Sequence, residues 1–303
     1  MVKTQSQGGK GDFHIKKLLI SLLILFLCAW GIWFAIPESF IASYIKDAPI
    51  GQNVDIDLIG LKKGLFYTIN IERVLLNTQQ KLNNPLMPPS STSAGEDNQS
   101  ISPPLLRGNK GEGVPLLTIQ NMDIDPDPLS ILKLTPQINI NGQVNLGTIR
   151  GLITMKQRNH DLYIVGKNIQ INGLSIIERT GIYGDGTLNF KFQRADEKGE
   201  FTFSIEDAKL KGALPGIGAL PLNVFKNVKG LLTIEDTLNV DSLTMEGKGI
   251  YVRIKGKIKE SNFDGNIEIM VDSSFDLYAV LQAFLERYKI SMGYYVIPYT
   301  KKI

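Results

Sequence analysis

Alternation of apolar and polar residues is the feature that most limits what this 303-residue chain can fold into. The segment Ile250–Lys259 shows it most clearly. One side of this segment carries Ile250, Val252, Ile254 and Ile258, and the other carries Tyr251, Arg253, Lys255, Lys257 and Lys259. Successive side chains of a strand point to opposite faces, so a period of two predicts a strand with one buried and one solvated face.

The same alternation recurs in residues 54–60, 65–76, 137–145, 147–155, 198–210, 231–245 and 263–271. Asn, Asp and Gly separate these segments at short intervals, as in antiparallel meanders. A last strand, interrupted by Pro298, is predicted for residues 293–303. The sequence therefore predicts a mainly-β fold built on an elongated, mostly antiparallel sheet.

One amphipathic helix is predicted near the C-terminus, over residues 276–289. Apolar residues recur there at helical spacing, at Leu277, Val280, Leu281, Phe284, Leu285 and Tyr288. A single apolar stripe indicates that the helix packs against the sheet. The residues expected to line either an apolar groove or a closed core are Ile250, Val252, Ile254, Ile258, Leu277, Val280, Leu281 and Phe284. The sequence alone does not separate those two outcomes.

Residues 18–36 form an uncharged apolar run of 19 residues. At about 1.5 Å per residue, a helix of this length spans the roughly 30 Å hydrocarbon core of a bilayer. Lysines at positions 3, 10, 16 and 17 precede the run, so the positive-inside rule places residues 1–17 in the cytoplasm and residues 37–303 on the other side. The alternative is a cleaved signal peptide. The length of the run and the lack of a small-x-small site after it favour an uncleaved single-pass anchor.

Residues 78–115 differ in composition from the rest of the chain, because they are rich in Pro, Gly, Ser and Asn and contain few apolar side chains. Such a segment does not bury enough apolar surface to offset the entropy that is lost on ordering. We therefore expect a disordered insertion between two strands of one fold. A proline-rich ligand for a partner domain is the alternative interpretation.

Composition excludes several classes of site. The net charge of +3 is small and spread along the chain, whereas a nucleic-acid-binding protein shows a concentrated basic patch. Cys28 is the only cysteine, and His14 and His160 are the only histidines, which is too few for a disulfide framework or a zinc site. The predicted anchor separates the two histidines. A Ser-His-Asp site would depend on His160 alone, and we expect that residue at an exposed hairpin tip.

The acidic residues also fail to form a predicted site. The aspartates of residues 123–127 have the spacing of a calcium loop, but Pro128 and Leu134 occupy the positions that need glycine and glutamate. Glu206 with Asp207, and the similar pair at 235 and 236, are adjacent residues whose side chains would point to opposite faces of a strand. We therefore predict no metal, no cofactor and no catalytic residue, and interpret the protein as a non-enzyme.

The segment 214–230 is apolar but contains two prolines and three glycines. It lacks the third glycine of a dinucleotide fingerprint and the Gly-Lys-Ser/Thr end of a phosphate loop. We interpret it as a crossover between strands, marked by Leu214, Pro215, Gly216, Gly218 and Pro221. Its apolar side chains at 214, 217, 220, 222, 224 and 225 are expected to form an apolar edge.

Residues 214–258, together with the N-terminal anchor, resemble the type II secretion system protein N family in its divergent, non-enterobacterial version. Residues 125–151 and 293–303 resemble the wider AsmA-like family of envelope proteins. The first resemblance implies an inner-membrane accessory component whose residues 37–303 lie in the periplasm. The second implies an elongated, curled sheet with an apolar inner face that can carry lipid. Neither family supplies catalytic residues.

Two functions are therefore hypotheses. In the first, the periplasmic sheet docks to inner-membrane and periplasmic secretion-system proteins while the anchor holds it at the membrane. In the second, membrane lipid binds in a groove lined by one face of the strands. Neither hypothesis involves nucleic acid or a cofactor.

Overall fold

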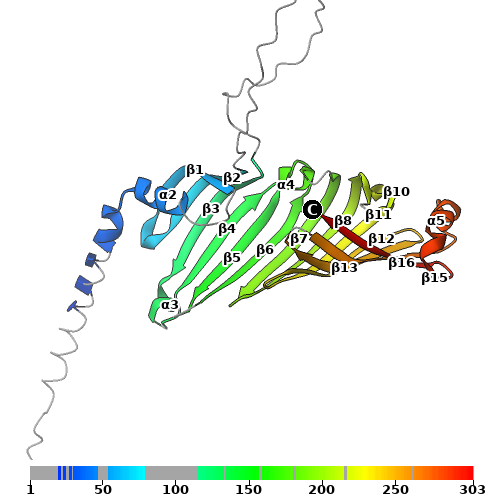
Figure 1. Cartoon of the computed structure of the whole chain (residues 1–303). Coiled ribbons are helices and arrows are strands. Elements are labelled where there is room, and N and C mark those ends of the chain that lie inside the picture. Colours follow the sequence, from blue (N-terminus) through cyan, green and yellow to red (C-terminus); the bar gives the residue numbers. More distant parts are fainter. Residues whose placement is uncertain are drawn as a thin grey trace, which may run out of the picture.

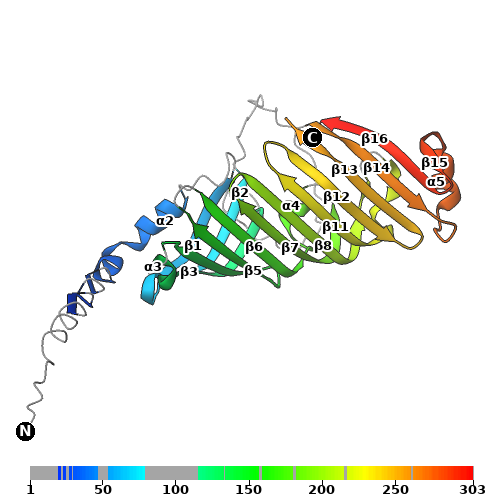
Figure 2. The same cartoon turned by 90° about the horizontal axis from the view of Figure 1, so that it is seen from below.

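The computed structural model describes residues 20–46 apart from 22, 25, 26 and 29, together with 54–78, 115–132, 134–156, 159–179, 182–214, 217–260 and 262–302. Most of these residues belong to one long, twisted sheet (Figures 1 and 2). Its strands are β1 (Val54–Lys63), β2 (Ile69–Thr78), β3 (Leu117–Asp127), β4 (Gln137–Val144), β5 (Gly147–Met155), β6 (His160–Gln170), β7 (Tyr183–Ala195), β8 (Lys198–Lys211), β11 (Phe225–Ile234), β12 (Leu238–Gly247), β13 (Ile250–Lys259), β14 (Asn262–Val271), β15 (Lys289–Ser291) and β16 (Tyr294–Lys302).

The order of strands in this sheet follows the chain almost without exception. It runs from β1 to β8, continues through β11, β12, β13 and β14, and ends with β16 and then β15. All pairings are antiparallel. The colour in Figure 1 therefore changes steadily from blue at one end of the sheet to red at the other. The structure confirms the predicted mainly-β, antiparallel fold.

The helices after residue 37 are short and lie along the rim and the ends of the sheet. They are α2 (Glu38–Lys46), α3 (Pro128–Leu132), α4 (Ser175–Glu178) and α5 (Tyr278–Leu285), with 3₁₀ turns η1 (Leu65–Tyr67), η2 (Leu222–Val224) and η3 (Glu286–Tyr288). The predicted crossover consists of β9 (Ala213–Leu214) and β10 (Ile217–Pro221), which pair with each other and lead through η2 into β11. Pro215 and Gly216 lie outside the described residues.

Three of the predicted segments differ from the structure. Residues 65–67, expected to begin a strand, form the 3₁₀ turn η1 before β2. Residues 231–245 were expected to form one alternating strand, but they form a hairpin, because a bend at residues 235–237 separates β11 from β12. The α-helix predicted for 276–289 spans only Tyr278–Leu285 and ends in a 3₁₀ turn before β15. By contrast, β5 spans the predicted residues, and β4, β8 and β14 match their predictions to within one residue at each end.

Three strands contain an extra residue in the left-handed conformation: Asn121 in β3, Asn168 in β6 and Asp207 in β8, with φ of 48°, 55° and 51°. Asn and Asp adopt this conformation more readily than other residues with a Cβ. Each such bulge directs two consecutive side chains outward. The inner-face apolar residues are therefore odd-numbered on one side of the bulge and even-numbered on the other. The adjacent carboxylates Glu206 and Asp207 are consequently both exposed, which corrects the expectation that their side chains point to opposite faces of the strand.

Helix α2 lies beside β1, and the helical residues before it extend away from the sheet (Figure 1). Of the described residues within 18–36, residues 20, 21, 23, 24, 27, 28 and 30–35 are helical and are here called the N-terminal helix, whereas residue 36 forms a bend. Of the helices formed by described residues, none is both long and apolar enough to cross a membrane. The predicted tail, 1–17, and most of the predicted insertion, 79–114, lie outside the described residues.

Candidate functional site

One face of the sheet, here called the inner face, carries apolar side chains over almost its whole length. Strand pairing aligns these side chains into rows that run from strand to strand. The row here called the open row consists of directly paired residues on β2 to β8 and β11: Ile69, Ile124, Ile140, Gly151, Ile164, Phe192, Phe201 and Leu232. All of them are half-buried.

A second row, parallel to the first, is buried. This covered row includes Val144, Ile169, Val228, Met245, Val252, Ile269 and Tyr295, each less than a tenth exposed. Leu174, next to α4, packs on its first part. Leu220 and Leu222 of the crossover and Leu281 and Leu285 of α5 pack on the rest. The inner face is therefore a closed core along one side of the sheet.

Ile69 and Ile124 share a hydrophobic cluster with Ile45 of α2, but the rest of the open row has no comparable cover. Among the described residues, no helix shares a hydrophobic cluster with Ile140, Ile164, Phe192, Phe201 or Leu232. A single sheet layer normally buries its apolar face against a second layer. The half-buried strip formed by the open row is therefore an apolar surface that another molecule can cover.

Neighbouring phenylalanine rings lie along this surface. The ring centroid of Phe201 lies 5.8 Å from that of Phe190 and 5.7 Å from that of Phe203. Phe190 and Phe203 lie across Gly166 and Gly230 of the neighbouring strands, so closely that a Cβ at either glycine would collide with the ring. Aromatic rings that cover glycines in this way lie down on the sheet instead of standing up from it.

A cavity of about 340 Å³ lies at the β1 end of the open row. Its lining consists of Trp33, Tyr67, Ile69, Ile124, Pro126, Pro128 and Ile138. Trp33 comes from the N-terminal helix, Tyr67 from η1, and the others from β2 to β4 and the start of α3. Two of the lining residues, Ile69 and Ile124, are themselves members of the open row.

Lys63 ties the N-terminal helix to the sheet beside this cavity. Its Nζ donates hydrogen bonds to the carbonyl oxygens of Trp33, Phe34 and Ile36, at 2.9, 3.0 and 2.5 Å. A cation at a helix C-terminus satisfies carbonyl groups that have no partner within the helix and complements the helix dipole. The indole Nε1 of Trp33 donates to the Gly64 carbonyl at 3.1 Å, so the ring as well as the backbone is held.

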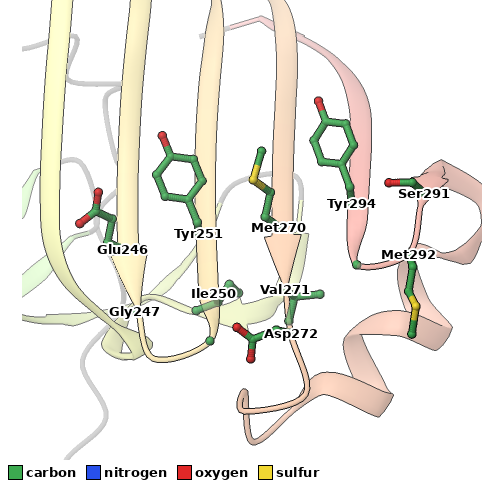
Figure 3. Close-up of a pocket in the computed structure, with 12 residues that line it drawn as sticks. Glu246, Gly247, Ile250, Tyr251, Met270, Val271, Asp272, Ser291, Met292 and Tyr294 are labelled. Carbon is green, nitrogen blue, oxygen red and sulfur yellow. The ribbon is translucent and has the colours of Figure 1, made fainter.

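The outer face has a hollow of about 560 Å³ near the other end of the sheet (Figure 3). Glu246, Tyr251, Met270 and Tyr294 stand side by side on β12, β13, β14 and β16, where they are paired in register. Beside them Arg253 donates hydrogen bonds to Glu268, which raises the pKa of the guanidinium. Because polar and apolar groups alternate along this hollow, it is less suited to an apolar ligand than the open row.

The residues predicted to line a groove or core divide into three groups. Ile250, Val252 and Leu281 are buried beneath or within the cover. Ile254 and Ile258 are half-buried on the inner face. The remaining three, Leu277, Val280 and Phe284, are exposed by 39%, 62% and 54%, so they are not part of the core. The reason is geometric. The apolar side chains of α5 cover a wider part of the helix surface than the part that contacts the sheet, and only the side that carries Leu281 and Leu285 packs on the strands.

Three residues of the predicted apolar edge, Leu220, Leu222 and Phe225, are part of the core. Leu220 and Phe225 are fully buried and Leu222 is 3% exposed. Leu214, Gly218 and Pro221 lie in the small β9–β10 pair. The open-row residues Phe192, Phe201 and Leu232 were missed, although the alternation of 198–210 already signalled that Phe201 faces one side together with Phe203.

Polar chemistry is sparse in the described part of the chain. No group of three or more His, Cys, Asp or Glu residues is placed there to hold a metal ion. Asp127 accepts a hydrogen bond from the backbone N–H of Leu129 at 3.0 Å, at the start of α3. Burial raises the pKa of the Tyr295 hydroxyl, which lies in the covered row.

Searches of protein-family models, curated protein sequences and solved structures find no match to this chain.

Proposed function

We propose that the protein is a non-enzymatic lipid-binding component of the cell envelope, and that acyl chains of membrane lipids lie on the open row. The observation that carries the proposal is the continuity of this row. Directly paired apolar residues run from the cavity at Trp33, across β2 to β8, to Leu232 in β11.

The size and chemistry of the strip suit a hydrocarbon chain. From β3 to β11 the row crosses six strand spacings, or about 29 Å, roughly twice the ~15 Å that lipid chains occupy in one leaflet of a bilayer. Each methylene that leaves water for an apolar surface contributes about 0.8 kcal/mol. A ligand with polar groups along its length would find no hydrogen-bonding side chain in the row, and burying unpaired polar groups is unfavourable.

Adjacent residues of β8 provide a direct test. Phe201 lies on the inner face and Thr202 on the outer face, so a photoreactive benzoylphenylalanine at each position samples opposite sides of the same strand. After illumination of the full-length chain in native membranes, mass spectrometry should find phospholipid attached at position 201 and little at position 202. Equal attachment at both positions, or none at 201, would contradict the proposal.

A second candidate function is docking to secretion-system proteins of the inner membrane and periplasm, with which the family resemblance agrees. The observation that favours it is a group of exposed apolar side chains on α5 and the β15–β16 hairpin. The most exposed are Val280 at 62%, Phe284 at 54%, Ile290 at 65% and Met292 at 88%. Exposed apolar clusters of this kind mark interaction sites more often than isolated apolar residues do.

Crosslinking in a native envelope tests this second candidate. Wild-type protein should recover inner-membrane or periplasmic secretion proteins, and Phe284→Asp should lose them. Leu146→Asp is the control, because Leu146 is a 91% exposed apolar residue at the β4–β5 turn, away from α5. Recovery of no secretion protein by the wild-type chain contradicts the docking function.

A further inference from the structure

The cavity at Trp33 lies where an apolar helix meets the start of the open row. Since Ile69 and Ile124 belong both to the row and to the cavity wall, the two form one continuous apolar surface. We infer that this cavity is the mouth through which an acyl chain of a bilayer lipid reaches the open row. The inference rests on the lipid-binding function proposed above.

The cavity wall selects hydrocarbon. Among its seven lining residues none is charged, and three are isoleucines and two are prolines. Proline has no backbone N–H, so Pro126 and Pro128 remove two donors that a polar ligand could use. With about 30 Å³ for each group of water size, 340 Å³ holds roughly eleven such groups. A methylene is similar in size, so the cavity suits the end of one acyl chain.

The mouth is held in shape by its surroundings. Tyr67 has a φ of 68°, a conformation that is an outlier for a bulky side chain. Such backbone strain persists only where neighbouring contacts impose it. Here the ring of Tyr67 packs against Trp33, with 5.4 Å between ring centroids, while Lys63 and Gly64 hold the helix that carries Trp33. The opening is thus a built feature and not a loose gap between helix and sheet.

The source of the chain is indicated by the helix that forms one wall. Its described side chains include Leu27, Ile32 and Phe34, which are exposed by 50%, 64% and 48%. A helix with apolar side chains directed outward is stable where lipid, not water, surrounds it. A lipid beside this helix is therefore next to the mouth, and its chain can enter without crossing water.

Filling the mouth provides the test. Ile138→Trp adds bulk to the cavity wall, whereas Ile234→Trp makes the same change on β11, a half-exposed inner-face position outside the cavity. Each variant also carries benzoylphenylalanine at position 201 as the reporter. The full-length chain is inserted into phosphatidylethanolamine–phosphatidylglycerol vesicles, and lipid attachment at 201 is followed with time of incubation before illumination. Since overpacking opposes passage, Ile138→Trp should slow attachment about tenfold. Ile234→Trp should leave the rate unchanged.

The outcomes separate the mouth from the lipid-binding function. If position 201 is labelled in all proteins but Ile138→Trp labels as fast as the reference, the mouth is elsewhere and lipid binding stands. If position 201 is labelled in none of them, the lipid-binding function itself fails. Circular dichroism checks that Ile138→Trp is folded. Should it be misfolded, Ile124→Trp fills the same cavity from β3 and is expected to slow attachment in the same way.

Discussion

A matched pair of truncations, Phe225→Ala and Phe201→Ala, tests whether the two sides of the inner face differ as the structure indicates. Both remove the same atoms. Phe225 is 0% exposed and sits in the cluster closed by the crossover and α5. Phe201 is half-buried, and its ring lies next to those of Phe190 and Phe203 in the sheet.

The expected costs follow from burial. Removing a fully buried phenylalanine leaves a cavity and costs about 3–5 kcal/mol of unfolding free energy. A half-buried ring loses only part of its transfer free energy and leaves no closed cavity, so Phe201→Ala should cost about 1 kcal/mol. At about 2–4 °C per kcal/mol for a domain of this size, Phe225→Ala should lower Tm by roughly 10 °C and Phe201→Ala by a few degrees.

The assay is unfolding of the full-length chain in detergent, followed by circular dichroism in heat and in urea. A second series adds phospholipid. A ligand present at about 100 times its Kd stabilises the folded state by about 2.7 kcal/mol, and this gain should shrink in Phe201→Ala because part of the binding surface is lost. Equal costs for the two truncations in the absence of lipid would refute the distinction between the open row and the covered row.

Three smaller perturbations test local features. Gly230→Val should destabilise the protein by about 1–3 kcal/mol in urea unfolding, since the added side chain displaces the phenylalanine ring that lies over the glycine. Ser274→Ala should raise the pKa of Asp272 in an NMR titration, because hydrogen bonds from the Ser274 hydroxyl and N–H lower it in the wild type. A lowered folded-state pKa means that this contribution to stability exists above the unfolded-state pKa and is lost as pH falls through the folded-state pKa, so Ser274→Ala should reduce acid sensitivity in that window. Lys63→Met should release the end of the N-terminal helix and accelerate proteolysis just after it, whereas Lys62→Met should not.

The sequence was sufficient to predict the type of sheet and several of its strands. Period-two alternation identified β5 and β13 because neither strand contains a bulge, so every second residue faces the same side along the whole strand. It could not predict the bulge at Asn168. A left-handed asparagine inside a strand depends on the pairing with β7, and that pairing is a tertiary contact.

The candidate site was harder to predict than the fold. Alternation shows that one face of a strand is apolar, but it does not show what lies over that face. Val252 and Phe201 follow the same pattern in the sequence, yet α5 and the crossover close over Val252 and leave Phe201 uncovered. The exposure of Phe284 was unpredictable for a similar reason, because only the docked position of α5 decides which margin of its stripe meets the sheet.

The strand order has a consequence for how the sheet holds together. Each strand touches mainly the strands before and after it, so stability is close to a sum of neighbour terms, as in a repeat protein. Such an assembly opens from its ends inward, and amide exchange should be fastest at β1 and β15 and slowest near β8 and β11. It also means that a hairpin can be gained or lost without changing any other pairing. The length of the apolar strip can therefore vary in steps of two strands, and each step changes it by about 10 Å. The mouth at one end of the sheet and α5 at the other end stay as they are.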